Sequence, residues 1–255
     1  MDAIVLVGGQ GTRLRPLTDR RHKSLAPLCN RPAIEYLLEW LARSGFGRVV
    51  FSLGVHNEDL AAAYPAGEHC GIEVGIVQES ERLESGGAIR YAVEQAGIQG
   101  RFTVVNGDVF VDFDFARTLA AHEAADAELT MALYEVDDPS MFGVAVTDEA
   151  GLITQFVEKP AAGTAPSRAV NAGVWIFEPQ LVGEIPPGAV RVEETLFPSL
   201  VEAGRRVLGY RFEGPWEDVG APERYRRLNM LLLDRGVPGI DMKAVISHSA
   251  HVEQS

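Results

Sequence analysis

Residues 3–16 read AIVLVGGQGTRLRP, an apolar run that passes directly into a glycine-rich segment. Five consecutive apolar residues bounded by glycine indicate a fully buried strand. Three of the next four positions, Gly8, Gly9 and Gly11, carry no Cβ. Backbone amides in such a segment can approach a polyphosphate closely and donate hydrogen bonds to it. The stretch therefore predicts a phosphate-binding loop at the carboxyl end of a buried strand.

The spacing of this loop separates it from two common glycine motifs. A P-loop requires GxxxxGK[ST], which the sequence lacks. A dinucleotide-binding GxGxxG starting at Gly9 would require a third glycine at position 14, which is Leu14, and no acidic residue closes the next strand at Leu53. A tight turn after a strand is common, but Arg13 and Lys23 add two fixed charges around the loop, which favours phosphate binding.

Strand and helix patterns alternate over residues 1–135. Apolar residues at 34, 37, 38 and 41 recur at helical spacing, whereas uninterrupted apolar runs indicate buried strands. The expected strands cover 3–7, 48–53, 72–78, 102–106 and 129–134, and the expected helices cover 32–41, 87–96 and 115–125. This alternation predicts βαβ units and an α/β fold, a Rossmann-like three-layer α/β/α arrangement around a mixed, mainly parallel central sheet. Ligands of such sheets bind at the carboxyl ends of the strands.

After residue 136 the pattern changes to shorter strands, expected at 144–147, 152–158 and 172–177, with Pro/Gly-rich turns between them. No linker separates the two halves, so we expect a single domain over 1–236, made of halves 1–135 and 136–236. Residues 237–255 form a C-terminal tail in which Ile240, Ile246 and Val252 recur every six residues. That period is typical of the first coil of a left-handed β-helix, either a docked tail or the start of a longer segment.

Composition restricts the function. A net charge of −13 over 255 residues argues against a nucleic-acid surface, although a few basic residues in one cleft can still bind a small anion. No apolar run approaches the roughly 20 residues that span a bilayer, so a cytoplasmic protein without membrane contact is expected. Cys29 and Cys70 lack the spacing of a zinc site or a disulfide framework. The six histidines form no ligand-spaced cluster and are interpreted as solvated surface residues.

Two acids far apart in the sequence suggest a metal site. Asp108 follows Gly107 at the end of the strand expected at 102–106, where a carboxylate can reach the ligand crevice. Magnesium binds one or two carboxylates together with phosphate oxygens and water, and Asp218 is the candidate for the second acid. The alternative is that Asn106 to Asp108 is only a turn and Asp218 a capping acid.

A series of motifs in this order resembles the sugar-1-phosphate nucleotidylyltransferases over about residues 1–230. The matching segments are Gly8-Gly9-x-Gly11-Thr12-Arg13-Leu14-x-Pro16, Lys23, Pro27, Arg31-Pro32, Gln78 through Gly87, Asn106-Gly107-Asp108, Phe142-Gly143-Val144, Val157-Glu158-Lys159-Pro160, Asn171-Ala172-Gly173 and Trp216-Glu217-Asp218-Val219-Gly220. The resemblance implies the nucleotide-diphospho-sugar transferase fold. It also implies that residues 1–135 are the nucleotide-binding half and 136–236 the sugar-binding half.

The resemblance assigns roles to individual residues. It implies catalytic roles for Arg13, Lys23, Asp108, Lys159 and Asp218. It implies nucleotide contacts from Val7, Gly8, Gly9, Gly11, Thr12, Arg13, Lys23, Gln78, Gly87 and Asp108, and sugar-phosphate contacts from Gly143, Glu158, Lys159 and Asn171. Mg²⁺ would bind Asp108 and Asp218. The implied partners are a nucleoside triphosphate, a sugar 1-phosphate and further copies of the chain in a homo-oligomer. Glu193 and Glu194 are weaker candidates for sugar contact, and Trp216 is expected to pack in the core rather than stack on the sugar.

The departures from the family bear on specificity. Glu84 replaces a glycine in a loop that resembles the base-recognition loop, and His22 and Ser24 replace prolines that often flank the lysine equivalent to Lys23. The segments around Glu84 and Asp108 resemble N-acetylmuramate-1-phosphate uridylyltransferases and heptose-1-phosphate guanylyltransferases, whereas 171–177 and 192–198 resemble mannose-1-phosphate guanylyltransferases. Guanylyl transfer is favoured. The alternatives are uridylyl or thymidylyl transfer, or a non-catalytic homologue that binds sugar nucleotides and regulates a partner.

Overall fold

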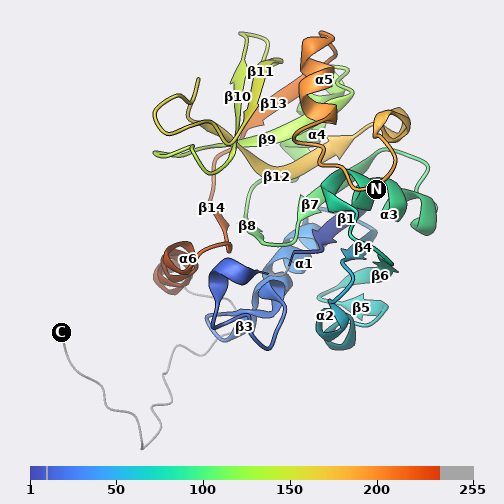
Figure 1. The fold of residues 1–255 in the computed structure, drawn as a ribbon, viewed down its shortest axis with the longest axis vertical. Coiled ribbons are helices and arrows are strands. Elements are labelled where there is room, and N and C mark those ends of the chain that lie inside the picture. The colour runs from blue at the N-terminus through green and yellow to red at the C-terminus, as the bar shows by residue number, and fades with distance from the viewer. Residues whose placement is uncertain (10, 236–255) are drawn as a thin grey trace, which may run out of the picture.

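The computed structural model describes residues 1–9 and 11–235, and it shows one large sheet with helices on both faces (Figure 1). The strands are β1 (Asp2–Val7), β2 (Pro27–Leu28), β3 (Arg31–Pro32), β4 (Arg48–Leu53), β5 (Gly67–His69), β6 (Ile72–Gln78), β7 (Phe102–Asn106), β8 (Val109–Val111), β9 (Leu129–Glu135), β10 (Gly143–Thr147), β11 (Ile153–Glu158), β12 (Ala169–Phe177), β13 (Val207–Arg211) and β14 (Trp216–Asp218). The α-helices are α1 (Ala33–Arg43), α2 (Glu58–Ala63), α3 (Glu84–Ala96), α4 (Phe115–Ala124), α5 (Leu196–Glu202) and α6 (Pro222–Arg235), and short 3-10 helices cover η1 (Thr12–Leu14), η2 (Lys23–Leu25) and η3 (Pro179–Glu184).

The central sheet is mixed, with four parallel strands at its centre and antiparallel strands beside them. Strands β7, β1, β4 and β6 run parallel to one another, and β12 joins them antiparallel to β7. The full order is β11-β10-β12-β7-β1-β4-β6-β5, with β9 and β13 extending from β12 as a parallel pair. The short β14 pairs with β8 outside the main sheet. The carboxyl ends of β1, β6 and β7 therefore lie along the same edge, as the parallel order requires.

Two apolar clusters cover the two faces of this sheet. Successive residues of β1 alternate between them, because side chains of a strand point to opposite faces. Val5 packs in the cluster that contains the buried side chains of α1, whereas Ile4 packs with those of α3 and α5. These layers confirm the expected three-layer α/β/α fold. None of the helices in the part of the chain that the structure describes is long and apolar enough to cross a membrane.

Most of the expected elements are present, with shifted ends. The strands at 48–53, 72–78 and 102–106 have the expected bounds, and the helix expected at 87–96 begins three residues earlier, at Glu84. Sequence patterns did not predict α2, α5, α6, β5, β8, β13 or β14, which are short or, in α6, rich in charge. The division of the domain at 135/136 stays a prediction, and the expected β-helical tail at 237–255 lies outside the described residues.

The surface interpretation of the histidines is wrong for His122, which is 1% exposed. Its Nδ1 lies 2.7 Å from the Thr130 hydroxyl and its Nε2 lies 3.1 Å from a Glu178 oxygen, so both ring nitrogens have partners. A buried imidazole is tolerated when its polar atoms are hydrogen-bonded. His248 and His251 lie outside the described residues. The two cysteines are free, half-buried thiols, in agreement with the sequence.

Gly87→Ala is expected to lower the free energy of unfolding. A Cβ at Gly87 would lie 2.3 Å from the carbonyl oxygen of Gly188, so the backbone would have to shift. Such overpacking typically costs about 1–3 kcal/mol, more than the roughly 1 kcal/mol that alanine gains over glycine in a helix. Urea unfolding measures the difference. Gly100→Ala is the control, because nothing lies within 4 Å of its Cβ position. Equal urea midpoints for the two variants would show that the backbone at Gly188 shifts to accept the extra Cβ without loss of stability.

Candidate active site

The glycine loop is shaped around Lys23, a side chain of η2. A Cβ at Gly9 would lie 3.1 Å from the Lys23 Nζ, and a Cβ at Gly11 would lie 2.8 Å from the Lys23 Cβ. Gly11 also has a φ of 62°, in the left-handed region that favours glycine. The loop can follow this path because Gly11 lacks a side chain, whereas a Cβ at Gly9 would press only on the flexible end of Lys23. The lysine and the phosphate loop predicted from the sequence therefore form one unit.

Lys23 reaches across to the carboxylate of Asp108, which follows β7. The two side chains form an ion pair and are 14% and 23% exposed. The next residue, Ser24, donates a 2.8 Å hydrogen bond from its hydroxyl to the carbonyl oxygen of Gly107. The segment at 23–24 and the segment at 107–108 are therefore joined by two neighbouring contacts. Burial alone would raise the pKa of Asp108, but the charge and the hydrogen bond of Lys23 outweigh burial and lower it. Asp108 is therefore an anion at neutral pH.

His22, beside Lys23, is buried with 5% exposure, so the surface interpretation is wrong here too. Its Nδ1 accepts a hydrogen bond of 3.2 Å from the backbone N–H of Ser24. Burial and the nearby Lys23 charge lower the pKa of His22 to about 4, and the imidazole is neutral at pH 7. Where prolines often flank the lysine in the family, hydrogen bonds of His22 and Ser24 fix this turn.

Asp218, 110 positions later in the sequence, comes to the same place. It ends β14, which pairs with β8, and the backbone N–H of Val219 donates to the carbonyl oxygen of Asp108 at 2.6 Å. Burial and the negative charge of Asp108 raise the pKa of Asp218. The two carboxylates are therefore close enough to repel each other. Arg13 is close as well, because a Cβ at Gly220 would lie 3.3 Å from its guanidinium. The two predicted metal acids and both predicted cations of the loop therefore converge.

The two acids fit a hard divalent cation. Neighbouring carboxylates repel each other, and a cation with oxygen ligands relieves that repulsion. In the part of the chain that the structure describes, no group of three or more His, Cys, Asp or Glu side chains could coordinate a metal. A magnesium ion at Asp108 and Asp218 would therefore take its other ligands from phosphate oxygens and water, which is the arrangement that Mg²⁺ prefers.

A cavity of about 230 Å³ opens beside this cluster, and a second of about 450 Å³ is lined by the glycine loop, including Thr12, and by residues 54–57. Gly8, Gly9, Glu79 and Arg82 line both cavities. The first is further lined by Leu6, Lys23, Ser52, Glu84, Ser85, Ala88, Asn106 and Asp108. The predicted nucleotide residues Gln78 and Gly87 lie just outside: the Gln78 amide donates to the Gly54 carbonyl, and Gly87 faces Gly188.

Glu79 is a candidate that sequence reasoning missed. It follows β6 directly and is 5% exposed, and burial raises its pKa. One carboxylate oxygen accepts a 3.2 Å hydrogen bond from the backbone N–H of Leu83. No arginine or lysine of the described chain forms an ion pair with it, whereas Arg82 pairs with Glu84. Its position at the carboxyl end of a parallel strand was the signal that could have identified it.

The predicted sugar-phosphate residues form a second group on β10, β11 and β12. Gly143 pairs with Glu158 in the sheet, and a Cβ at Gly143 would lie 2.8 Å from the Glu158 carboxylate. Lys159 lies 3.2 Å from the same carboxylate and is 49% exposed. The Asn171 side-chain oxygen accepts hydrogen bonds from the Gly173 N–H and the Trp175 indole. Arg191, which the sequence did not single out, also pairs with Glu158 at 3.3 Å.

This second group is connected to the cluster through Gly173. A Cβ at Gly173 would lie 2.7 Å from the Asn106 amide nitrogen, and Asn106 ends β7 two residues before Asp108. Glu193 lies deeper, where burial raises its pKa and the Ser85 hydroxyl donates to it at 2.5 Å. The site therefore runs from the glycine loop, past the two acids, to the Glu158 carboxylate beside Gly143.

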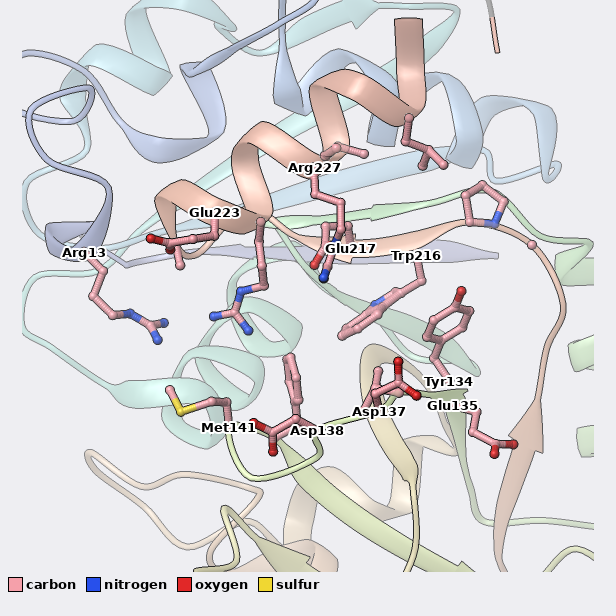
Figure 2. Close-up of a pocket in the computed structure, with 18 of the residues that line it drawn as sticks. Arg13, Tyr134, Glu135, Asp137, Asp138, Met141, Trp216, Glu217, Glu223 and Arg227 are labelled. Atoms are coloured by element: carbon pink, nitrogen blue, oxygen red, sulfur yellow. The ribbon is translucent and has the colours of Figure 1, made fainter. Parts of the chain in front are cut away.

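Trp216 packs in the core, as expected. It is 7% exposed, and its indole N–H donates to the Ala172 carbonyl at 2.9 Å. It also lines a larger cavity of about 810 Å³, with Tyr134 beside it and Arg13 at the opposite edge (Figure 2). That cavity lies on the α1 side of β12, because Trp216 packs in the apolar cluster of α1.

The model of the nucleotidyl transferase family matches residues 2–235. The chain belongs to the nucleotidyl transferase family. A mannose-1-phosphate guanylyltransferase from Mycobacterium tuberculosis is 35% identical over 89% of this chain and 63% of its own length. A mannose-1-phosphate guanylyltransferase catalytic subunit beta from Danio rerio is 35% identical over 88% and 62%. A UTP–glucose-1-phosphate uridylyltransferase from Synechocystis is 29% identical over 95% and 67%. The chain thus spans less than two thirds of the length of the two guanylyltransferases.

Solved structures agree with the fold of this family. HddC from Yersinia pseudotuberculosis superposes with a TM-score of 0.77 at 24% identity, covering 91% of this chain and 99% of that chain. A UDP-glucose pyrophosphorylase complexed with UDP-glucose superposes with a TM-score of 0.79 at 21% identity, covering 92% and 99%. These matches confirm the transferase fold that the motifs implied.

Proposed function

We propose that the chain transfers a guanylyl group from GTP to a sugar 1-phosphate, with mannose 1-phosphate favoured, and releases pyrophosphate. The observation that carries the proposal is the convergence of Arg13, Lys23, Asp108 and Asp218 beside the glycine loop. The names of the guanylyltransferase relatives support the same reaction. Residues 2–235 contain every residue to which we assign a role.

The reaction needs little covalent help from the protein. The sugar phosphate is already an anionic nucleophile and pyrophosphate is a good leaving group, so positioning and charge neutralisation supply the catalysis. Lys23, within reach of Asp108, neutralises the triphosphate near the reacting phosphorus. Arg13 neutralises the departing pyrophosphate, and Lys159 binds the attacking phosphate. Glu158, Asn171 and the Gly143 backbone orient the sugar hydroxyls.

Asp108 and Asp218 would bind Mg²⁺, which supplies stabilisation of negative charge on phosphate oxygens when it is present. The described residues contain no group of three metal-ligating side chains, so phosphate oxygens and water would supply the remaining ligands of such an ion. Both acids would hold the ion, and Lys23, whose partner in the structure is Asp108, would then be available to the phosphates.

Glu79 supports guanine as the base. In its ionised form the Glu79 carboxylate only accepts hydrogen bonds. Guanine presents the adjacent N1–H and N2–H donors on one edge, and such donors would favour that form against the effect of burial. Uracil and thymine present one N–H between two carbonyl oxygens, which a carboxylate repels. Glu79 is buried without a pairing cation in the described chain, so a base with two donors satisfies it best.

Glu79→Gln is expected to reduce the preference for GTP over UTP by about 10- to 100-fold, because the hydrogen bonds to a charged acceptor are lost. The ratio of kcat/KM values for the two nucleotides measures the effect. Glu81→Gln is the matched control, since Glu81 is exposed on the same loop. An unchanged ratio in a folded Glu79→Gln variant would remove Glu79 from base recognition.

A matrix of nucleoside triphosphates against sugar 1-phosphates tests the function, with magnesium present and pyrophosphate release as the readout. The account expects release with GTP and mannose 1-phosphate above all other pairs. The second candidate is uridylyl transfer, which the Synechocystis relative favours, and release with UTP and glucose 1-phosphate would establish it. No release with any pair, together with tight binding of a nucleotide sugar, would support the non-catalytic homologue instead.

A further inference from the structure

Arg224, in the first turn of α6, forms an ion pair inside the candidate site. Its Nε lies 3.0 Å from Oδ1 of Asp218, and its side chain is only 15% exposed. The guanidinium carbon lies 5.3 Å from the centre of the Phe142 ring. Arg224 is therefore held between the acid that ends β14 and the aromatic residue before β10. None of the roles assigned above uses it.

Each of the two facing acids has its own protein cation. Lys23 contacts Asp108, and Arg224 contacts Asp218, whose Oδ1 also accepts from the backbone N–H of Gly220 at 2.8 Å. A divalent cation between these acids would draw on the same two carboxylates, and its positive charge would oppose that of the two protein cations. The ion and the two protein cations therefore compete for the negative charge of one pair of acids.

The structure provides space for the Arg224 side chain away from Asp218. Arg224 and Phe142 line the cavity of about 810 Å³. Figure 2 shows Arg13 and Trp216 on two sides of the same cavity. Phe142 forms part of its wall, and the guanidinium already lies beside that ring, so a turn away from Asp218 would take it into the cavity.

We propose that Arg224 is a positioning residue that occupies Asp218 in the metal-free protein and withdraws into the neighbouring cavity when a divalent cation binds. The inference rests on the metal assignment within the proposed function. Arg224 keeps the two acids from repelling each other before the ion arrives. It also lowers the affinity for the free ion, so that the ion binds well only together with the phosphates.

A purely structural role predicts the opposite effect. If Arg224 served to hold Asp218 in the orientation that a metal needs, its removal would weaken metal binding. If it competes with the ion, its removal strengthens metal binding. The sign of the change in affinity separates the two roles, and neither result depends on the transferase activity.

The experiment is a titration of the full chain with Mn²⁺ alone, without nucleotide or sugar, in which electron paramagnetic resonance reports the free ion. Arg224→Gln is expected to lower the Kd for Mn²⁺ about 10-fold, since a charge-assisted contact that competes for Asp218 is gone. Arg224→Met, which keeps an unbranched apolar side chain at this position, is expected to give the same change and serves if the glutamine variant does not fold. An unchanged or higher Kd in a folded variant would overturn the proposal.

Two further variants make the result specific. Arg227→Gln is the matched control, because Arg227 lines the same cavity but pairs with Glu217, and its Kd should stay within about two-fold of wild type. Asp218→Asn should weaken Mn²⁺ binding. If it does so while the Arg224 variants change nothing, the inference fails and the metal assignment stands. If Asp218→Asn leaves binding unchanged, the metal assignment of the proposed function is wrong, and the inference falls with it.

Discussion

Asp108→Asn is expected to lower kcat by about 10³-fold or more. The asparagine has the same shape, so the substitution removes the charge that pairs with Lys23 and that, in the proposed function, would bind the metal. Stabilisation of phosphoryl charge by a metal is worth several kcal/mol, and each 1.36 kcal/mol is ten-fold in rate. Pyrophosphate release at saturating magnesium measures the loss.

Asp112→Asn is the control for this result. Asp112 lies four residues later and pairs with Arg43 on the surface, where such ion pairs contribute little. We expect it to retain full activity. If the Asp108→Asn variant is folded and keeps its activity in the presence of a chelator, Asp108 is not a metal ligand.

Lys23→Ala should reduce kcat by about 10²- to 10³-fold, the typical loss when one donor to developing negative charge is removed. The alanine would also leave space beneath Gly9 and Gly11, which pack against this side chain. Lys23→Met separates the two effects, because it fills the space without the charge. Single-turnover rates with GTP and a sugar 1-phosphate measure both variants.

The turnover of Lys23→Met decides whether the effect of Lys23 comes from its charge or from its packing. A loss as large as that of alanine assigns the effect to charge. Near wild-type turnover in Lys23→Met would mean that the lysine only supports the loop by packing. Arg20→Ala, an exposed arginine on the same loop, is expected to change turnover little.

Much of the fold could be predicted from the sequence because the parallel strands β1, β4, β6 and β7 are five to seven residues long and mostly apolar. The run at 102–106 could be assigned without ambiguity, and the residue just beyond it had to lie at the ligand edge of the sheet. The same rule could not bring Asp218 to that edge, because β14 is three residues long and pairs only with β8. The resemblance to a family predicted that Asp218 and Asp108 act together. The hydrogen bond from the Val219 N–H to the Asp108 carbonyl oxygen now shows what holds the two segments side by side.

The remaining site residues depend on contacts that no local pattern encodes. Glu79 lies beside a close approach of two loops: a Cβ at Gly54 would lie 2.8 Å from the Gly8 carbonyl oxygen, and a Cβ at Gly8 would lie 4.0 Å from a Glu79 carboxylate oxygen. Arg224 cannot be told from Arg226 and Arg227 by periodicity, since all three are charged residues at the start of one helix. His22 looked like a surface residue because its burial comes from the turn around Lys23. Such residues become visible only when distant segments are placed together.

A crystal structure with a non-hydrolysable GTP analogue and Mg²⁺ tests the central claim most directly. The account predicts the triphosphate on the backbone of residues 8–12, one ion between Asp108 and Asp218, and the guanine edge on Glu79. A nucleotide bound elsewhere, with no ion between the two acids and with Lys23 still paired to Asp108, would contradict it.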